Sequence, residues 1–136
     1  MAWVVDTCLL LDIGLDDPHF AEKTGKLLTR KSGDGLVICP VTYIELAPAF
    51  GGNTKPLQEF LFNLGVEHRE DWTWEDTAKA GAAWSHYVEM RRARQAVKRP
   101  VADVLIGAFA SRFQGLLTRN ACDFTKIFPQ LPIAGP

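Results

Sequence analysis

The chain has 136 residues, of which 47% are hydrophobic and 23% are charged, a profile typical of a single globular domain. Its formal net charge of −1 argues against an intrinsically disordered chain and against a general nucleic-acid coat. No apolar stretch approaches the roughly 20 residues of a membrane span, and the first residues lack the cationic start of a signal peptide. The three cysteines form no C-x-x-C pair, which favours reduced thiols and a cytoplasmic protein.

In its first half the chain alternates short apolar strands with amphipathic helices. Residues 3–5 predict a strand that ends at Asp6. Asp17 followed by proline indicates the start of a helix, because a capping side chain precedes a residue whose fixed φ suits the first turn. The elements expected after it are a strand over residues 36–39, a helix from about 42, a helix over about 56–64 and a short strand from 66.

In the second half the predicted helices are longer. Thr73 and Asp76 have the spacing of a capping box and open the longest predicted helix. Pro100 starts a further helix that Gly115 ends. Its expected apolar face repeats with a helical period and comprises Ala102, Leu105, Ile106, Phe109, Ala110 and Phe113. A strand over residues 116–118 and a weaker one near 133 complete an α/β pattern, which predicts a parallel sheet covered on both faces.

Four acidic residues fall where such a fold would bring them to one edge of the sheet. Asp6 ends the first strand, and Glu45 lies early in the helix after the second. Asp103 lies near the start of the helix that leads into strand 116–118, and Asp123 follows that strand. Ligands bind at the carboxyl ends of parallel strands, and clustered carboxylates repel one another unless a cation neutralises them. Mg²⁺ or Mn²⁺ suits such oxygen ligands, so the pattern predicts metal-assisted phosphodiester hydrolysis.

Each of these acids also has a structural explanation. Glu45 would complete a capping box with Thr42. Asp103 would be favoured by the dipole of its helix, and Asp123 would be an ordinary cap. For Asp6 a functional role is favoured more strongly, because an ionised carboxyl group at the end of a buried strand is costly unless it is paired or bound to metal.

One glycine supports a functional role of Asp103, and the other acids of the chain are interpreted without one. Gly107, one turn after Asp103, would leave room beside that carboxylate, although a glycine inside a helix costs about 1 kcal/mol relative to alanine. The remaining acidic residues, Asp12 among them, are interpreted as solvated surface.

Four segments, in order along nearly the whole chain, resemble the motifs of PIN-domain ribonucleases, in particular the VapC-type toxins of toxin–antitoxin pairs. They are V-D-T-C-L-L from Val5, P-V-T-Y-I-E-L from Pro40, V-A-D-V-L-I-G-A from Val101 and L-T-R-N-A-C-D-F from Leu117. The resemblance implies one PIN domain over residues 1–136, a three-layer α/β/α fold with a central parallel sheet of four to five strands. It also implies an acidic pocket that binds Mg²⁺ or Mn²⁺ and cleaves RNA.

The same resemblance assigns roles to individual residues. Asp6 and Asp103 would be direct metal ligands, and Glu45 would hold the metal or orient the attacking water. Thr7 and Thr118 would hydrogen-bond the carboxylates and position them.

The fourth acidic position departs from the pattern, because Asn120 stands where some members have an acid and Asp123 comes three residues later. The resemblance further implies a homodimer that is inhibited by a small, VapB-like antitoxin, with no association with a membrane.

Two other interpretations of the function are considered. A phosphatase of the haloacid-dehalogenase type needs Asp-x-Asp after its first strand, and the triplet here is Asp6-Thr7-Cys8. A catalytically degenerate PIN-like domain that binds RNA or a partner without cleaving it remains an alternative because of Asn120. A basic stretch would contact the RNA backbone or would be a solvated helix end; it comprises Arg91, Arg92, Arg94, Lys98 and Arg99.

Overall fold

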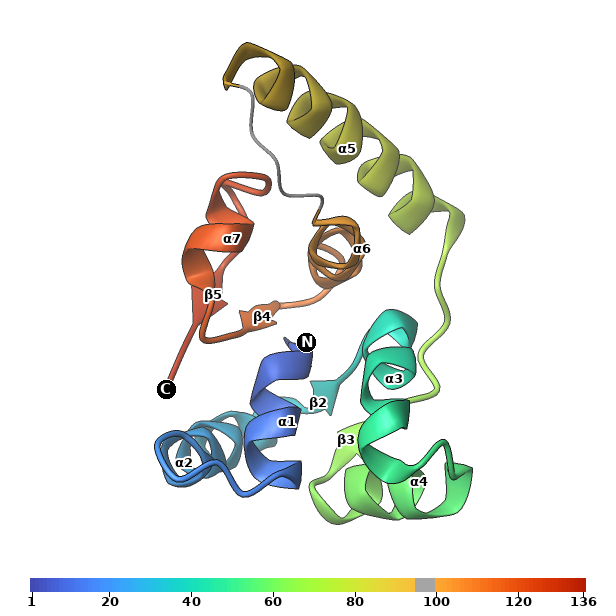
Figure 1. Ribbon diagram of the computed structural model, residues 1–136, viewed down its shortest axis with the longest axis vertical. Coiled ribbons are helices and arrows are strands. Elements are labelled where there is room, and N and C mark those ends of the chain that lie inside the picture. The colour runs from blue at the N-terminus through green and yellow to red at the C-terminus, as the bar shows by residue number, and fades with distance from the viewer. Residues whose placement is uncertain (95–99) are drawn as a thin grey trace.

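A five-stranded parallel sheet forms the centre of the computed structural model, which describes residues 1–94 and 100–136 (Figure 1). Its strand order is β3-β2-β1-β4-β5. The strands are β1 (Trp3–Val5), β2 (Leu36–Val37), β3 (Val66–Glu67), β4 (Gly115–Leu117) and β5 (Ile133–Ala134). The α/β fold with a central parallel sheet of four to five strands is therefore confirmed, including the weak strand expected near residue 133.

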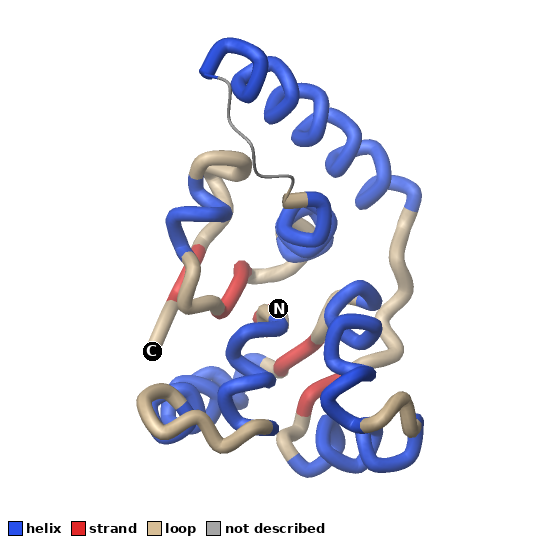
Figure 2. Tube along the Cα trace, viewed as in Figure 1, coloured by secondary structure: helices blue, strands red, loops and turns tan. Residues whose placement is uncertain are grey.

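Seven helices are described around the sheet (Figure 2). They are α1 (Thr7–Gly14), α2 (Ala21–Lys31), α3 (Pro40–Leu46), α4 (Thr54–Asn63), α5 (Trp74–Arg94), α6 (Val101–Ala110) and α7 (Ala121–Thr125). Two short 3₁₀ turns, Ser32–Asp34 and Ala47–Phe50, follow α2 and α3. No helix in the described ranges has the length and apolar character needed to cross a membrane.

Alternation along the strands divides the hydrophobic core into two halves. In β1, Val4 faces one side of the sheet, and Trp3 and Val5 face the other. Successive side chains of a strand point to opposite faces, so inner strands such as β1 and β2 contribute to both halves of the core. Leucines of α1, α2, α3 and α4 pack on the Val5 side, whereas residues of α5, α6 and α7 pack on the Val4 side. The result is the expected three-layer arrangement.

Two helices, α1 and α7, were not expected from the sequence, and each begins shortly after a strand. α1 begins at Thr7, and the Asp6 carboxylate caps it by accepting the Thr7 backbone N–H at 2.8 Å. α7 is only one turn or so long and follows β4 after three residues. Short apolar runs such as that of α1 do not distinguish strand from helix by periodicity, which explains the omission.

The predicted helix starts are shifted by a few residues. Asp17 accepts hydrogen bonds from the backbone N–H groups of His19 and Phe20, but these close a turn, and α2 begins only at Ala21. α3 begins earlier than expected, at Pro40, because proline occupies its first turn.

The capping box that opens α5 is confirmed, with reciprocal bonds of 3.0 and 3.2 Å between Thr73 and Asp76. Arg112, which follows α6, donates two hydrogen bonds to the same carboxylate at 3.1 and 2.9 Å. Burial of Asp76 opposes its charged form, but the bonds from Arg112 and Thr73 prevail and lower its pKa. This ion pair joins the start of α5 to the end of α6.

α6 is buried more widely than its expected single face. Val104, Gly107 and Ala108 are buried along with Ile106, Phe109 and Ala110, because α6 lies between the sheet and α5 (Figure 1). Gly107 has a packing role that the sequence did not indicate: a Cβ atom there would collide with the ring of Phe128, so this glycine lets Phe128 pack against α6. The room it would leave beside Asp103 stays a prediction.

Candidate metal centre

Asp6 lies at the end of the central strand, at the middle of the carboxyl edge of the sheet. Its side chain is buried, with 5% of its surface exposed. Oδ1 accepts the Thr7 backbone N–H at 2.8 Å, and Oδ2 accepts the Thr118 hydroxyl at 2.7 Å and the Cys8 thiol at 3.4 Å. Thr118 reaches Asp6 because β4 pairs with β1 in a register that places Leu117 beside Val5. The start of α1 and the end of the neighbouring strand β4 thus fix this carboxylate.

Glu45 is the next-to-last residue of α3, not an early one as expected, and it joins the site through Thr7. The Thr7 hydroxyl donates to Glu45 Oε1 at 2.6 Å, and its oxygen lies 3.0 Å from that of Thr42. The expected capping box between Thr42 and Glu45 is wrong, because Thr42 lies inside α3 and Glu45 instead accepts a hydrogen bond from the Thr7 hydroxyl. Glu45 is exposed, so the rest of its carboxylate faces solvent.

The environment of Asp6 disfavours its negative charge. Burial raises the pKa of Asp6, and the neighbouring charge of Glu45 adds to this effect. Hydrogen bonds from Thr118, Cys8 and Thr7 lower it only in part. A cation placed beside these two carboxylates would relieve both the desolvation and the repulsion. The electrostatics therefore favour a metal ion or another positive group at this edge.

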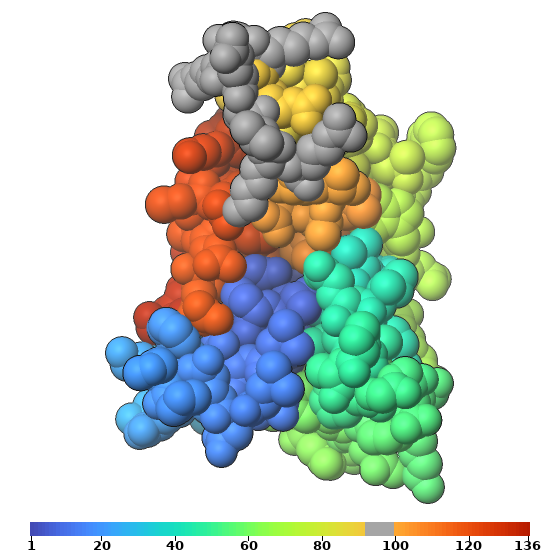
Figure 3. All heavy atoms as spheres, viewed as in Figure 1, coloured from blue at the N-terminus to red at the C-terminus, as the bar shows by residue number. Residues whose placement is uncertain are grey.

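Asp103 lies half-buried in the first turn of α6. Because α6 leads into the parallel strand β4, its first turn lies at the carboxyl edge, the same edge as Asp6. α6 also contacts α3, the helix that carries Glu45, and the surfaces of α1, α3 and α6 meet on one face of the molecule (Figure 3).

The described residues nevertheless include no group of three His, Cys, Asp or Glu side chains placed to hold a metal ion. Ligation by both Asp6 and Asp103 thus stays a prediction.

Asn120 and Asp123 are attached to the site through the backbone. The Asn120 backbone N–H donates to the Thr118 hydroxyl oxygen at 3.0 Å, which holds Thr118 toward Asp6. Asp123 lies in the first turn of α7, where its N–H donates to the Asn120 carbonyl at 3.0 Å. Within residues 1–94 and 100–136, neither side chain hydrogen-bonds Asp6 or Glu45, so neither is identified as the fourth acidic position.

The basic stretch falls largely outside the described residues. Lys98 and Arg99 lie there entirely, as do the side chains of Arg92 and Arg94. Arg91 is half-buried near the end of α5. Contact of this stretch with a nucleic acid stays a prediction.

A buried ion pair beside the site was missed in the sequence. Asp12 was interpreted as solvated surface, but only 3% of its side chain is exposed. Arg119 donates to both of its oxygens at 2.8 Å, Thr24 donates to one at 3.1 Å, and the Arg119 guanidinium lies 4.0 Å from the centre of the Phe20 ring. The available signal was a single acid within the apolar run of residues 9–13, since a buried carboxylate needs a partner.

Cys8 is a second missed contributor. Burial, together with the charge of Asp6, raises the pKa of Cys8 to about 11. The neutral thiol therefore acts as a hydrogen-bond donor to Asp6 near pH 7 and adds no charge to the site. Nothing in the sequence other than its place two residues after Asp6 indicated this role.

No family model and no curated protein matches the sequence. Among solved structures, the fold is similar to a chain in the crystal structure of VapBC2 from Rickettsia felis bound to a DNA fragment from their promoter. The TM-score is 0.61 with 17% sequence identity, and the match covers 99% of this chain and 98% of that one. The chain thus has, over nearly its full length, the fold that the resemblance to VapC-type PIN domains implies.

Proposed function

We propose that this chain is a Mg²⁺- or Mn²⁺-dependent endoribonuclease and the toxin of a toxin–antitoxin pair. One observation carries the proposal: a buried carboxylate, Asp6, ends the central strand of a parallel sheet next to a second carboxylate, Glu45. Three donors hold Asp6, yet its pKa is raised. Such a group is stabilised by a cation at the place where this fold class binds its ligands.

The residues present fit a magnesium-type ion. Mg²⁺ is commonly held by one or two carboxylates, several waters and the phosphate of the substrate, and does not require a complete cage of protein ligands. Asp6 uses three of its roughly four acceptor positions for internal hydrogen bonds, and Glu45 faces solvent with Oε2. Asp6 and Asp103 would hold the ion. When bound, it would polarise a phosphodiester and lower the pKa of a bound water.

The protein itself orients these groups. Thr118 and Cys8 direct Oδ2 of Asp6, and the Thr7 N–H directs Oδ1. Thr7 also fixes one oxygen of Glu45, which leaves the other to accept a proton from the attacking water. Each of these donors keeps a carboxylate in one orientation, so little reorganisation is needed when the phosphodiester arrives.

The identity of the substrate and partners belongs to the same proposal. The choice of RNA over DNA, the homodimer and the VapB-like antitoxin are supported by the four sequence motifs and by the fold of a chain whose structure is titled VapBC2. The catalytically degenerate alternative is favoured by one observation, the presence of Asn120 in place of an acid. It predicts no Mn²⁺-dependent rise in thermal stability.

The proposal is tested by RNA cleavage with purified protein that is free of antitoxin. We expect cleavage of a labelled RNA with Mg²⁺ or Mn²⁺, loss of cleavage in EDTA, and loss in Asp6→Asn. Asp34→Asn serves as a matched control, because Asp34 is an exposed acid in the turn before β2. Activity that persists in EDTA and in Asp6→Asn would refute the mechanism.

A further inference from the structure

A second pocket, of about 620 Å³, opens at the same edge of the sheet, next to β4 and β5. Segments from both ends of the chain form it: the start of α2, the turn after β4, α7 and the last strand. The residues used below are Phe20, Lys23, Thr118, Arg119, Leu131 and Ile133. No acidic side chain is among the described residues that line it, which also include Gly135 and Pro136, the last residue of the chain.

The pocket adjoins the metal centre through one residue. Thr118 lines the pocket, and its hydroxyl donates to Asp6 at 2.7 Å. A group that occupies the pocket is therefore separated from the central carboxylate by a single side chain. The pocket and the metal centre are therefore neighbours at the carboxyl edge of the sheet.

The pocket combines apolar walls with one available positive charge. Phe20, Leu131 and Ile133 contribute apolar surface. The charge of Arg119 is already balanced by Asp12, and its guanidinium covers the Phe20 ring. Lys23 is exposed, and no ion pair among the described residues involves it. A ligand with a flat apolar part and a negatively charged part fits this combination.

We propose that this pocket binds one nucleotide of the RNA beside the cleaved phosphodiester. The base lies against the apolar walls, and a phosphate oxygen accepts a hydrogen bond from Lys23. This inference rests on the proposed ribonuclease function and adds to it a binding position outside the metal centre. Base contacts of this kind tolerate several sequences, whereas the lysine contributes affinity without sequence preference.

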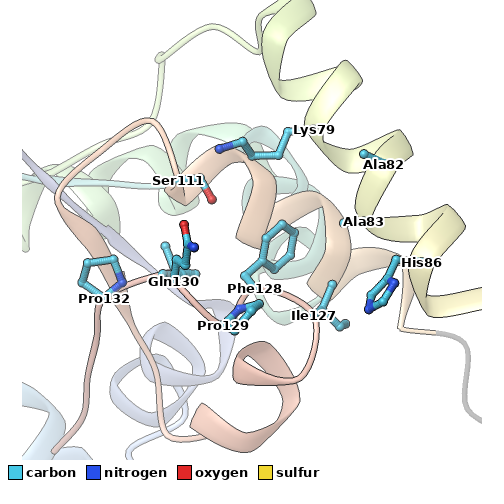
Figure 4. Close-up of a pocket in the computed structure, with 11 residues that line it drawn as sticks. Lys79, Ala82, Ala83, His86, Ser111, Ile127, Phe128, Pro129, Gln130 and Pro132 are labelled. Atoms are coloured by element: carbon cyan, nitrogen blue, oxygen red, sulfur yellow. The ribbon is translucent and has the colours of Figure 1, made fainter. Parts of the chain in front are cut away.

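Another pocket of comparable size serves as a control (Figure 4). Lys79, Ser111 and Gln130 point into it, and it measures about 490 Å³. It lies near residues that precede β4 and β5, at the amino ends of these strands, and so on the side away from Asp6. Lys79 is exposed, as Lys23 is. Lys79→Ala therefore removes a pocket lysine of the same type without affecting the proposed RNA path.

The first test measures binding and does not depend on cleavage. Anisotropy of a fluorescein-labelled single-stranded oligoribonucleotide is recorded in EDTA over a series of salt concentrations. We expect Lys23→Ala to weaken binding several-fold and to reduce the slope of log K against log salt by about 0.7, the value for one lost phosphate contact. Lys79→Ala should leave both quantities at the wild-type values. Equal behaviour of the two variants would overturn the proposal.

The second test locates the base. One abasic nucleotide is moved along the oligoribonucleotide, and binding is measured for each position. We expect one position at which the abasic nucleotide weakens wild-type binding about tenfold, with a smaller effect in Phe20→Leu. In the cleavage assay the same position should lie within one nucleotide of the cut and should raise KM while leaving kcat unchanged. A uniform response along the oligonucleotide would overturn the subsite. Failure of wild-type cleavage alone would refute the nuclease, while the binding measurements still decide the pocket.

Discussion

The ion pair between Asp12 and Arg119 gives a quantitative prediction for Asp12→Asn. The Asp12 carboxylate accepts two hydrogen bonds from the guanidinium and one from Thr24. Hydrogen bonds to charged groups contribute about 1.5–3 kcal/mol each. Asparagine retains one acceptor oxygen, and water replaces part of the lost contact because Arg119 is 26% exposed. We therefore expect the free energy of unfolding to fall by about 2 kcal/mol.

Urea unfolding measures this change directly. With an m-value of about 2 kcal/mol/M, typical of a small domain, the midpoint should fall by about 1 M while m stays constant. The control is Glu22→Gln, which removes an exposed pair with Lys26 one helical turn away. Exposed pairs of this kind contribute less than about 0.5 kcal/mol. If Asp12→Asn lowered the midpoint no more than Glu22→Gln, the reasoning about the buried pair would be refuted.

Three further predictions concern other contacts. Thr118→Val removes a donor to Asp6 and should weaken Mn²⁺ binding, measured by calorimetry, by about 10- to 100-fold; unchanged affinity would contradict it. The pKa of Asp76 is lowered in the folded state, so its contribution to stability is present above pH ~4 and is lost as pH falls through the folded-state pKa. The stability difference between wild type and Asp76→Asn should thus stay constant above about pH 5 and shrink as the pH falls below about 4 in urea titrations, and a difference that stays constant down to about pH 2 would argue against it. Gly107→Ala should destabilise the protein by about 1–3 kcal/mol through its clash with Phe128, and Phe128→Leu should restore part of the loss if that contact is the cause.

The sequence predicted the sheet well because the strands are continuous apolar runs. Their apolar character follows from burial on both faces, so the strands around residues 3–5, 36–39 and 116–118 were placed to within one or two residues. The capping box at Thr73 was also correct, because its signal lies entirely in local spacing. In contrast, α1 was missed, since its apolar run is too short for periodicity to distinguish a helix from a strand.

The site was predicted in part, for a similar reason. Topology brings the end of β1, the helix α3 and the start of α6 to one edge, and this could be inferred from the alternation of elements. The partners of individual side chains could not. Asp12 pairs with Arg119, which lies 107 positions away in the sequence. Glu45 accepts a hydrogen bond from Thr7 and not from its neighbour Thr42. Such pairings depend on tertiary packing, which local spacing does not encode.

Asp6 has two structural roles, and this has a practical consequence. The same carboxylate that ends β1 also caps α1 through the Thr7 N–H. Asparagine caps helices about as well as aspartate does, so Asp6→Asn should remove the negative charge while the first helix keeps its start. Under the proposed function, that variant would be a folded protein with impaired metal binding, and it could be used to isolate uncleaved RNA from cells.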